Sequence, residues 1–141
     1  MNKILIAADG SPYTTKALEY LIEHQAQFGL SPVIELIHVR HPLPSRAASA
    51  LGRETVQKYY ADETRKSLVP ARRMLDKAGF TYTVVQRVGD AAEQISGHAQ
   101  KGKFTLLVMG SHGHGALATM ALGSTVSKVL ARCKTPMLIL R

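Results

Sequence analysis

Residues 106–129, LLVMGSHGHGALATMALGSTVSKV, combine a strand, a glycine-rich loop and the start of a helix. The apolar run at residues 106–109 predicts a buried strand that ends at Gly110. The loop that follows contains three further glycines, Gly113, Gly115 and Gly123. It leads to residues 124–127, STVS, a run suited to the first turn of a helix. Glycine permits close backbone approach, and the free N–H groups of a first helical turn attract anions, so this stretch predicts a phosphate-binding loop.

The rest of the chain alternates apolar strands with amphipathic helices. Strands are predicted at residues 3–8, 33–39, 82–88, 105–109 and 137–140. Helices are predicted at residues 12–28, 54–78, 91–100 and 124–133. The first strand is apolar almost throughout, which is typical of a central strand covered on both faces. This alternation predicts a three-layer α/β fold, an open parallel sheet with helices on both faces and right-handed crossovers.

Short local signals mark where two of the helices begin. Ser11 followed by Pro12 suits the N-cap and the first position of a helix, which Gly29 then ends. Asp90 is expected to cap the helix at residues 91–100.

The middle of the chain carries two interruptions. Residues 41–53 contain two prolines and no clear period, so we expect a mobile surface loop there. Pro70 lies inside the helical pattern at residues 54–78. Because proline costs about 3 kcal/mol in a helix interior, we expect a kink or a break into two helices near Val69.

Length and composition are those of one compact domain. With 141 residues, 45% of them hydrophobic, the chain can bury a core of its own, so a single domain over residues 1–141 is expected. No apolar run approaches the roughly 20 residues of a membrane span, and the first apolar stretch is too short for a secretory signal. The lone Cys133 cannot form an internal disulfide. These features predict a cytoplasmic protein that does not insert into a membrane.

The chain is basic, with a formal net charge of +8 and a pI near 9.9. No acidic residue follows Glu93, so the later lysines and arginines are unopposed in sequence. This pattern predicts a positive field around the glycine loop, which favours phosphate. The aromatic residues are not interleaved with the basic ones as they are in stacking platforms, so nucleic acid is not the expected partner.

Two loops are expected to border one site. Ligands of open parallel sheets bind outside the carboxyl ends of the strands, where the strand order reverses. The loops richest in glycine and polar residues are residues 9–11 (DGS), after the first strand, and residues 110–124, after the fourth. If these strands are neighbours, both loops face one crevice. Two roles stay open for Asp9, which can contact a ligand or cap the turn before the first helix.

Two common nucleotide motifs do not fit the glycine loop. A Walker A loop needs a lysine directly after its last glycine, and no lysine follows Gly115 or Gly123 at that position. Residues 113–118 match a loose dinucleotide pattern, but the acidic residue expected about 20 positions later is absent. The glycines fit a different pattern, G-x2-G-x9-G-[ST], formed by Gly110, Gly113 and residues 123–124.

This pattern, with other segments in the same order, resembles the universal stress protein family. The matching segments are residues 3–11 (KILIAADGS), 38–39 (HV), 88–90 (VGD), 108–111 (VMGS) and 136–140 (PMLIL). The resemblance covers essentially the whole chain, and the order and spacing of these motifs are more specific than any one of them.

The resemblance implies a Rossmann-like fold of the adenine nucleotide α-hydrolase-like type, with a five-stranded sheet in the order 3-2-1-4-5. It implies that ATP or a related adenine nucleotide (ADP or AMP) binds in the crevice, where Asp9 contacts the adenosine part and Val39 meets adenine through its backbone. The ribose and phosphates are then held by Gly110, Gly113, Gly123, Ser124 and Thr125. The complete set of expected ligand-binding positions is Ala8, Asp9, Ser11, Val39, Met109, Gly110, His112, Gly113, Gly123, Ser124, Thr125 and Val126.

The resemblance also implies an assembly and a role. Members of the family commonly form dimers by pairing their last strands, which here implies a homodimer through Met137, Leu138, Ile139 and Leu140. An apolar strand at the edge of a sheet otherwise lies open, which favours this interface. The implied role is a stress-response regulator whose ligand state or dimer controls a protein partner that the sequence does not identify.

Some positions depart from the family pattern. Thr105 stands where an acidic residue is common, and His112 stands where arginine is common. No basic residue lies between Gly115 and Lys128, where many relatives carry one. These departures imply weaker binding of a triphosphate, or a preference for AMP or ADP.

Asp9 is the one acidic residue that we place near the glycine loop. ATP hydrolysis needs a positioned water, a base and usually a metal held by carboxylates. A single carboxylate can hold Mg²⁺ through the nucleotide's phosphates, but we identify no catalytic residues and no protein metal site. We therefore favour a nucleotide-binding regulator over two alternatives: a slow ATPase or phosphotransfer protein, and a dimeric adaptor that binds no nucleotide.

Overall fold

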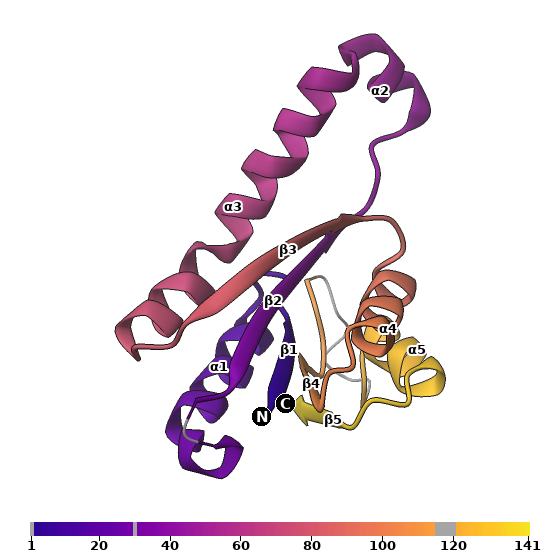
Figure 1. Cartoon of the computed structure of the whole chain (residues 1–141). Coiled ribbons are helices and arrows are strands. Elements are labelled where there is room, and N and C mark those ends of the chain that lie inside the picture. The colour runs from indigo at the N-terminus through magenta and orange to yellow at the C-terminus, as the bar shows by residue number, and fades with distance from the viewer. Residues whose placement is uncertain (1, 30, 115–120) are drawn as a thin grey trace.

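The computed structural model describes residues 2–29, 31–114 and 121–141, so Gly115 of the glycine loop lies outside the described residues. Its centre is a parallel five-stranded sheet in the order β3-β2-β1-β4-β5 (Figure 1). The strands are β1 (Lys3–Ala7), β2 (Val33–Arg40), β3 (Tyr82–Val88), β4 (Leu106–Gly110) and β5 (Met137–Leu140). The predicted α/β class, the positions of the strands and their order are confirmed.

Helices cover both faces of the sheet (Figure 1). They are α1 (Pro12–Glu23), α2 (Ser45–Leu51), α3 (Arg53–Lys77), α4 (Ala91–Lys101) and α5 (Ser124–Arg132), with a short 3-10 helix, η1 (Gln25–Phe28), after α1. One core packs α1 and α3 against the sheet, and the other packs α4 and α5 against the opposite face. Alternate residues of β1 enter the two cores: Ile4 and Ile6 face α1 and α3, whereas Leu5 faces α4 and α5.

The sheet reverses its winding at β1. This strand pairs with β2 on one side, with Leu5 opposite Glu35, and with β4 on the other, with Leu5 opposite Leu107. Both pairings are parallel, so the loops that follow β1 and β4 leave the same edge of the sheet next to each other. This arrangement creates the crevice described below.

The region predicted as a loop at residues 41–53 instead contains α2. Both prolines of this region precede the helix, so they do not interrupt it, and Pro44 occupies its N-cap position. The residues within α2 include three alanines and a leucine, which are strong helix formers. Gly52, with φ 83°, ends the helix in a conformation that favours glycine. In Figure 1, α2 and the first half of α3 extend beyond the sheet.

The predicted break near Val69 is also absent, because α3 continues as one helix of 25 residues through Pro70. Pro70 is exposed, so the carbonyl that loses its helical partner, that of Lys66, can bond to water. The opposite side of the helix packs Leu68 and Ala71 on either side of the proline into the core. This packing on both sides of Pro70 keeps α3 continuous through the proline.

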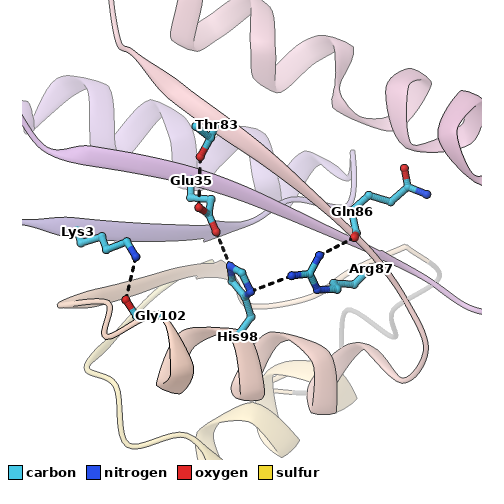
Figure 2. Close-up of polar contacts among 7 residues, drawn as sticks. All are labelled: Lys3, Glu35, Thr83, Gln86, Arg87, His98 and Gly102. Atoms are coloured by element: carbon cyan, nitrogen blue, oxygen red, sulfur yellow. Dashed lines mark hydrogen bonds and ion pairs between the residues drawn. The ribbon is translucent and has the colours of Figure 1, made fainter.

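A polar network joins α4 to β2 and β3 (Figure 2). Glu35 contacts Nε2 of His98 and accepts a hydrogen bond from Oγ1 of Thr83 at 3.3 Å. Nδ1 of His98 faces the guanidinium of Arg87 at 3.5 Å, and Arg87 donates a second bond to the carbonyl of Gln86 at 3.0 Å. A guanidinium only donates, so this geometry makes Nδ1 of His98 the acceptor and Nε2 the donor to Glu35. The network fixes α4 against β2 and β3, and the end of β2 lines the crevice described below.

No helix in the described part of the chain combines the length and the apolar character that a membrane span requires.

We predict that Gly110→Ala destabilises the protein by about 1–3 kcal/mol, because the new Cβ meets the backbone of α1 and cannot be relieved by a side-chain rotation. An ideal Cβ at Gly110 lies 2.5 Å from Cβ and 2.9 Å from the carbonyl carbon of Tyr13. The measurement is the free energy of unfolding in urea.

The matched control is Gly97→Ala in α4, where an added Cβ meets nothing within 4 Å. This exchange should stabilise the helix by about 0.5–1 kcal/mol. Equal stability of the two variants would contradict the close packing of α1 on the end of β4.

Candidate functional site

A crevice of about 100 Å³ lies at the carboxyl ends of β1 and β4. Its described walls come from the ends of β1, β2 and β4, the loops after β1 and β4, and the starts of α1, α4 and α5. The described lining residues are Ala7, Ala8, Asp9, Thr14, Ile37, Val39, Ala91, Ile95, Met109, Gly110, His112, Gly113, Thr125 and Val126. The crevice thus joins the two loops that sequence analysis expected to face each other.

Asp9 organises the turn between β1 and α1. Its Oδ1 accepts hydrogen bonds from the backbone N–H of Ser11 at 2.9 Å and from the hydroxyl of Thr14 at 2.7 Å. Both roles considered for Asp9 are therefore geometrically available, because one carboxylate oxygen caps the turn while the residue also lines the crevice. The carboxylate is an acceptor only, so it suits a ligand hydroxyl or amino group.

Ser11 occupies the N-cap of α1 but makes no capping bond with its side chain, and its Oγ is buried without a partner. The predicted side-chain cap by Ser11 is therefore not formed; Asp9 instead accepts a hydrogen bond from the backbone N–H of Ser11 and so holds the turn just before the helix. Ser11 is not among the described residues that line the crevice.

Two contacts tie the loop after β4 to the loop after β1. An ideal Cβ at Gly113 lies 2.8 Å from Oδ2 of Asp9, so only glycine fits at this approach without a shift. Nε2 of His114 lies 2.7 Å from the backbone oxygen of Asp9. A carbonyl oxygen only accepts, so Nε2 carries the proton and donates it to this hydrogen bond. The two loops therefore meet directly at Asp9.

The first turn of α5 faces the other side of the crevice through Thr125 and Val126. Gly123 is the N-cap residue of α5 and, as a glycine, has no side chain with which to cap it. The N–H of Gly123 bonds to the carbonyl of Ser111 at 2.7 Å, and the first helical bond runs from Ser127 to Gly123. The N–H groups of Ser124, Thr125 and Val126 have no partner within the helix, because they precede its first bond.

Apolar side chains form the inner end of the crevice. Ile37 and Val39 come from β2, Met109 comes from β4, and Ala91 and Ile95 come from α4. Sequence analysis selected Val39 and Met109 but missed the other three residues, together with Ala7 and Thr14. Ile37 precedes Val39 by two residues, and this alternation could have indicated that both point to the same face. No local signal places Ala91 or Ile95 there, because their position depends on the packing of α4.

The structure brings most of the predicted site residues together. Those that line the crevice are Ala8, Asp9, Val39, Met109, Gly110, His112, Gly113, Thr125 and Val126. Gly123 is not among the described lining residues but packs against the loop after β4. An ideal Cβ at Gly123 would lie 3.1 Å from the carbonyl oxygen of Ser111. Ser124 is exposed at the start of α5 and, like Ser11, is not among the described lining residues.

The basic residues near the glycine loop in sequence are not among the described residues that line the crevice. Among the described lining residues, Asp9 is the only acid, and none is a lysine or an arginine. Lys101 and Lys103 flank Gly102, whose carbonyl accepts a hydrogen bond from Lys3 at the start of β1. That position is the amino edge of the sheet, opposite the crevice. Closeness in sequence to the glycine loop therefore does not bring Lys101 and Lys103 close to the crevice in space.

Thr105 lies at the same amino edge. Its hydroxyl accepts from the N–H of Lys3 and donates to the carbonyl of Lys3, both at 3.0 Å. The departure from the family pattern at Thr105 therefore concerns strand pairing rather than the crevice. His112 does line the crevice, with Nδ1 2.8 Å from the hydroxyl of Ser111 and its ring 5.0 Å from that of Tyr13.

His38 is a buried histidine that sequence analysis did not assign. It is 4% exposed, and Nδ1 lies 2.7 Å from the carbonyl oxygen of Ala8, so Nδ1 carries the proton and Nε2 is unpartnered. Burial lowers the pKa of His38, although the hydrogen bond to Ala8 opposes this shift. The imidazole thereby supports the backbone immediately before Asp9.

Across residues 2–29, 31–114 and 121–141, no three histidine, cysteine or acidic side chains come together as a metal site.

The fold and the crevice define a class of protein: an open parallel α/β sheet with a crevice at the carboxyl ends of two central strands, the place where ligands of such sheets bind. The universal stress protein family model matches residues 1–141. Universal stress protein YxiE of Bacillus subtilis (strain 168) is 30% identical over 152 aligned residues, which cover 99% of each chain. Universal stress protein Slr1230 of Synechocystis is 32% identical over 143 residues, 100% of this chain and 43% of Slr1230. The chain belongs to the universal stress protein family.

Solved structures have the same fold. The protein MJ0577 superposes with a TM-score of 0.80 at 23% identity, covering 99% of this chain and 94% of that one. A universal stress protein in complex with cAMP gives 0.70 at 22% identity, with 99% and 97% covered. A family member from Arabidopsis thaliana with AMP bound gives 0.67 at 15% identity, with 99% and 91% covered.

We predict that stability falls as the pH drops below the ordinary histidine pKa of about 6.5, with His38 contributing at most about 1.4 kcal/mol per pH unit. Its folded pKa is lowered, so the unfolded chain binds the proton first, and acid favours unfolding until the pH reaches the folded value. His38→Asn preserves a donor to Ala8 without an imidazole. The measurement compares urea unfolding at about pH 8 and pH 5.5 for both proteins.

The same exchange at the exposed His41 controls for the loss of an imidazole elsewhere. A pH dependence that is equally steep in wild type and His38→Asn would refute this account of His38.

Proposed function

We propose that this protein binds an adenine nucleotide in the crevice between the loops after β1 and β4, and that the bound state regulates a protein partner. The observation that carries the proposal is that three environments line one crevice: apolar side chains, a carboxylate, and the start of a helix whose N-cap residue is a glycine. Adenine, ribose and phosphate, respectively, suit these three environments. The family relatives with bound cAMP and AMP support the assignment of the ligand.

Each part of the nucleotide has a chemical counterpart in the crevice. Adenine is a flat apolar ring with polar edges, and Ile37, Val39 and Met109 offer an apolar slot for it. The ribose carries hydroxyl donors, and the carboxylate of Asp9 accepts them through the oxygen that the turn does not use. The phosphate accepts from the N–H groups at the start of α5.

The crevice favours binding over catalysis. Asp9 already accepts two hydrogen bonds within its own turn, which suits a positioning group better than a mobile general base. ATP with Mg²⁺ held through its phosphates remains an alternative ligand, and slow turnover of ATP is the second candidate function. A turnover assay with purified protein separates the two functions.

Gly113→Val should abolish nucleotide binding while leaving the protein folded. The branched side chain would begin 2.8 Å from Oδ2 of Asp9 and fill the space between the two loops. We expect calorimetric titration with AMP to show at least a hundredfold loss of affinity, or about 2.7 kcal/mol. Circular dichroism checks the fold.

Gly97→Ala is the control variant, because it changes a glycine of α4 whose added Cβ meets nothing. It should bind AMP like the wild type. Unchanged affinity in Gly113→Val would remove the crevice as the binding site. Absence of any adenine nucleotide binding in the wild type would instead favour the adaptor function.

The proposal includes a homodimer through β5. This strand pairs with β4 on one side, and its four residues are half-buried. The carbonyls of Pro136 and Leu140 accept from Leu107 and Ser111, so the backbone groups of Met137 and Ile139 point away from β4. They are available to a second copy of the strand.

Ile139→Pro should convert the dimer to a monomer, because it removes an N–H that faces the partner and leaves the ladder with β4 intact. Sedimentation at micromolar concentration measures the change, and circular dichroism confirms that the variant is folded. Leu130→Ala removes an exposed apolar side chain on α5, away from this edge, and serves as the control. A Ile139→Pro variant that sediments as the wild-type dimer would place the interface elsewhere.

A further inference from the structure

We propose that a groove between α1 and α3 binds an amphipathic helix of a protein partner, one that carries lysine or arginine beside its apolar stripe. The groove has a volume of about 420 Å³. Its described lining residues are Glu19, Ile22 and Glu23 of α1, Met74 and Lys77 of α3, and Ala78 directly after α3. None of them lines the crevice, so this proposal goes beyond the nucleotide site and does not depend on nucleotide binding.

The groove lies at the opposite end of α1 from the crevice. α1 begins directly after the turn that Asp9 holds, whereas Glu19 and Glu23 belong to its last two turns. The α3 wall comes from the last turn of that helix, shortly before β3 begins at the amino edge of the sheet. A bound nucleotide and a docked helix therefore use separate surfaces.

A homodimer through β5 would leave the groove open. α1 and α3 pack on the same face of the sheet, with α3 over β2 and β3 and α1 over β4 and β5 (Figure 1). The groove between the two helices thus lies over the middle of the sheet, on the side of α1 that faces away from β5. Each copy in the proposed dimer presents its own groove.

The apolar part of the lining is suited to an apolar stripe. Ile22, Met74 and Ala78 are half-buried, and Met74 also packs against the core beneath the two helices. Covering such side chains with those of a partner contributes favourable free energy, and the unbranched methionine adapts its shape to the side chain it meets. Helices with an apolar face are recognised by laying that face into grooves of this kind.

The two glutamates of the α1 wall determine the charge of the partner. Glu19 and Glu23 are one helical turn apart, a spacing at which like charges repel. They lie near the negative end of the helix dipole, and the last turn of α1 has no basic residue. Both side chains are exposed, and within the described part of the chain neither forms an ion pair. Each of these unfavourable effects is relieved by a cation of the partner.

Lys77 lies on the other wall and matches the end of its own helix. It is the basic residue in the last turn of α3, where a cation complements the helix dipole. The acidic wall is therefore the α1 side, where Glu19 and Glu23 have Cβ atoms about 5–6 Å apart. Two lysines or arginines one turn apart on a partner helix have the same spacing and can meet both carboxylates, whereas a small amine with one charge can meet only one.

The test measures the binding of two labelled helical peptides of about 14 residues, or four turns, to the full chain by fluorescence anisotropy at low salt. Both peptides carry leucines at positions i, i+3, i+4 and i+7. One has two lysines a turn apart beside the leucines, and the other has glutamates at the same positions. We expect the lysine peptide to bind roughly tenfold more tightly than the glutamate peptide.

Variants of the protein locate the binding. The double variant Glu19→Gln, Glu23→Gln should weaken binding of the lysine peptide about threefold to tenfold, because it removes both charge pairs. Ile22→Gln should weaken binding of both peptides, because it removes apolar contact area. The control, Glu54→Gln with Asp62→Asn, removes the same number of charges from α3 away from the groove and should bind both peptides like the wild type. Circular dichroism confirms that each variant is folded.

Three results would overturn the proposal: no binding of the lysine peptide, equal affinity for the two peptides, or unchanged binding in the double variant of Glu19 and Glu23. Displacement of the lysine peptide by octylamine at equal concentration would assign the groove to a small apolar amine and overturn the assignment to a helix. None of these results bears on nucleotide binding, which calorimetry with AMP tests separately.

Discussion

The parallel pairing of β1 with β4 is the constraint on which the crevice depends. It places Ile6 opposite Val108, so both strands end at the same edge of the sheet. The loops after them then meet within a few residues, with Gly113 against the carboxylate of Asp9. Because β2 pairs with the other side of β1, it adds its own end to the apolar wall. One reversal of strand order thus assembles residues that lie about a hundred positions apart in the chain.

Several groups around this edge support the shape of the site. Asp9 uses one carboxylate oxygen to hold the turn before α1, and the buried His38 holds the carbonyl of Ala8 just before it. Farther from the crevice, toward the amino edge of the sheet, the Glu35–His98 contact anchors α4 to β2. The contacts of Asp9 and His38 hold backbone at the rim of the crevice. The protein's own contacts therefore set the geometry of the loop after β1.

The net positive charge of the chain is not reflected in the side chains that line its crevice. The net charge of +8 suggests a strong general attraction for anions, yet the wall of the crevice carries a carboxylate and, among its described residues, no lysine or arginine. The partners proposed for a phosphate there are backbone N–H groups and a helix dipole, not cationic side chains. Global charge and local recognition are separate properties in this protein.

Local sequence determined the strands, their approximate ends and the start of α5, because apolar runs, glycines and helix starts act over a few residues. The resemblance in motif order added the strand order and the residues expected at the site. Tertiary structure decided the rest. Pro70 stays within one helix because the packing of Leu68 and Ala71 on the sheet outweighs a local propensity. Ala91 and Ile95 line the crevice, whereas Lys101 does not. Contacts between residues distant in sequence decide both positions, and no local pattern encodes them.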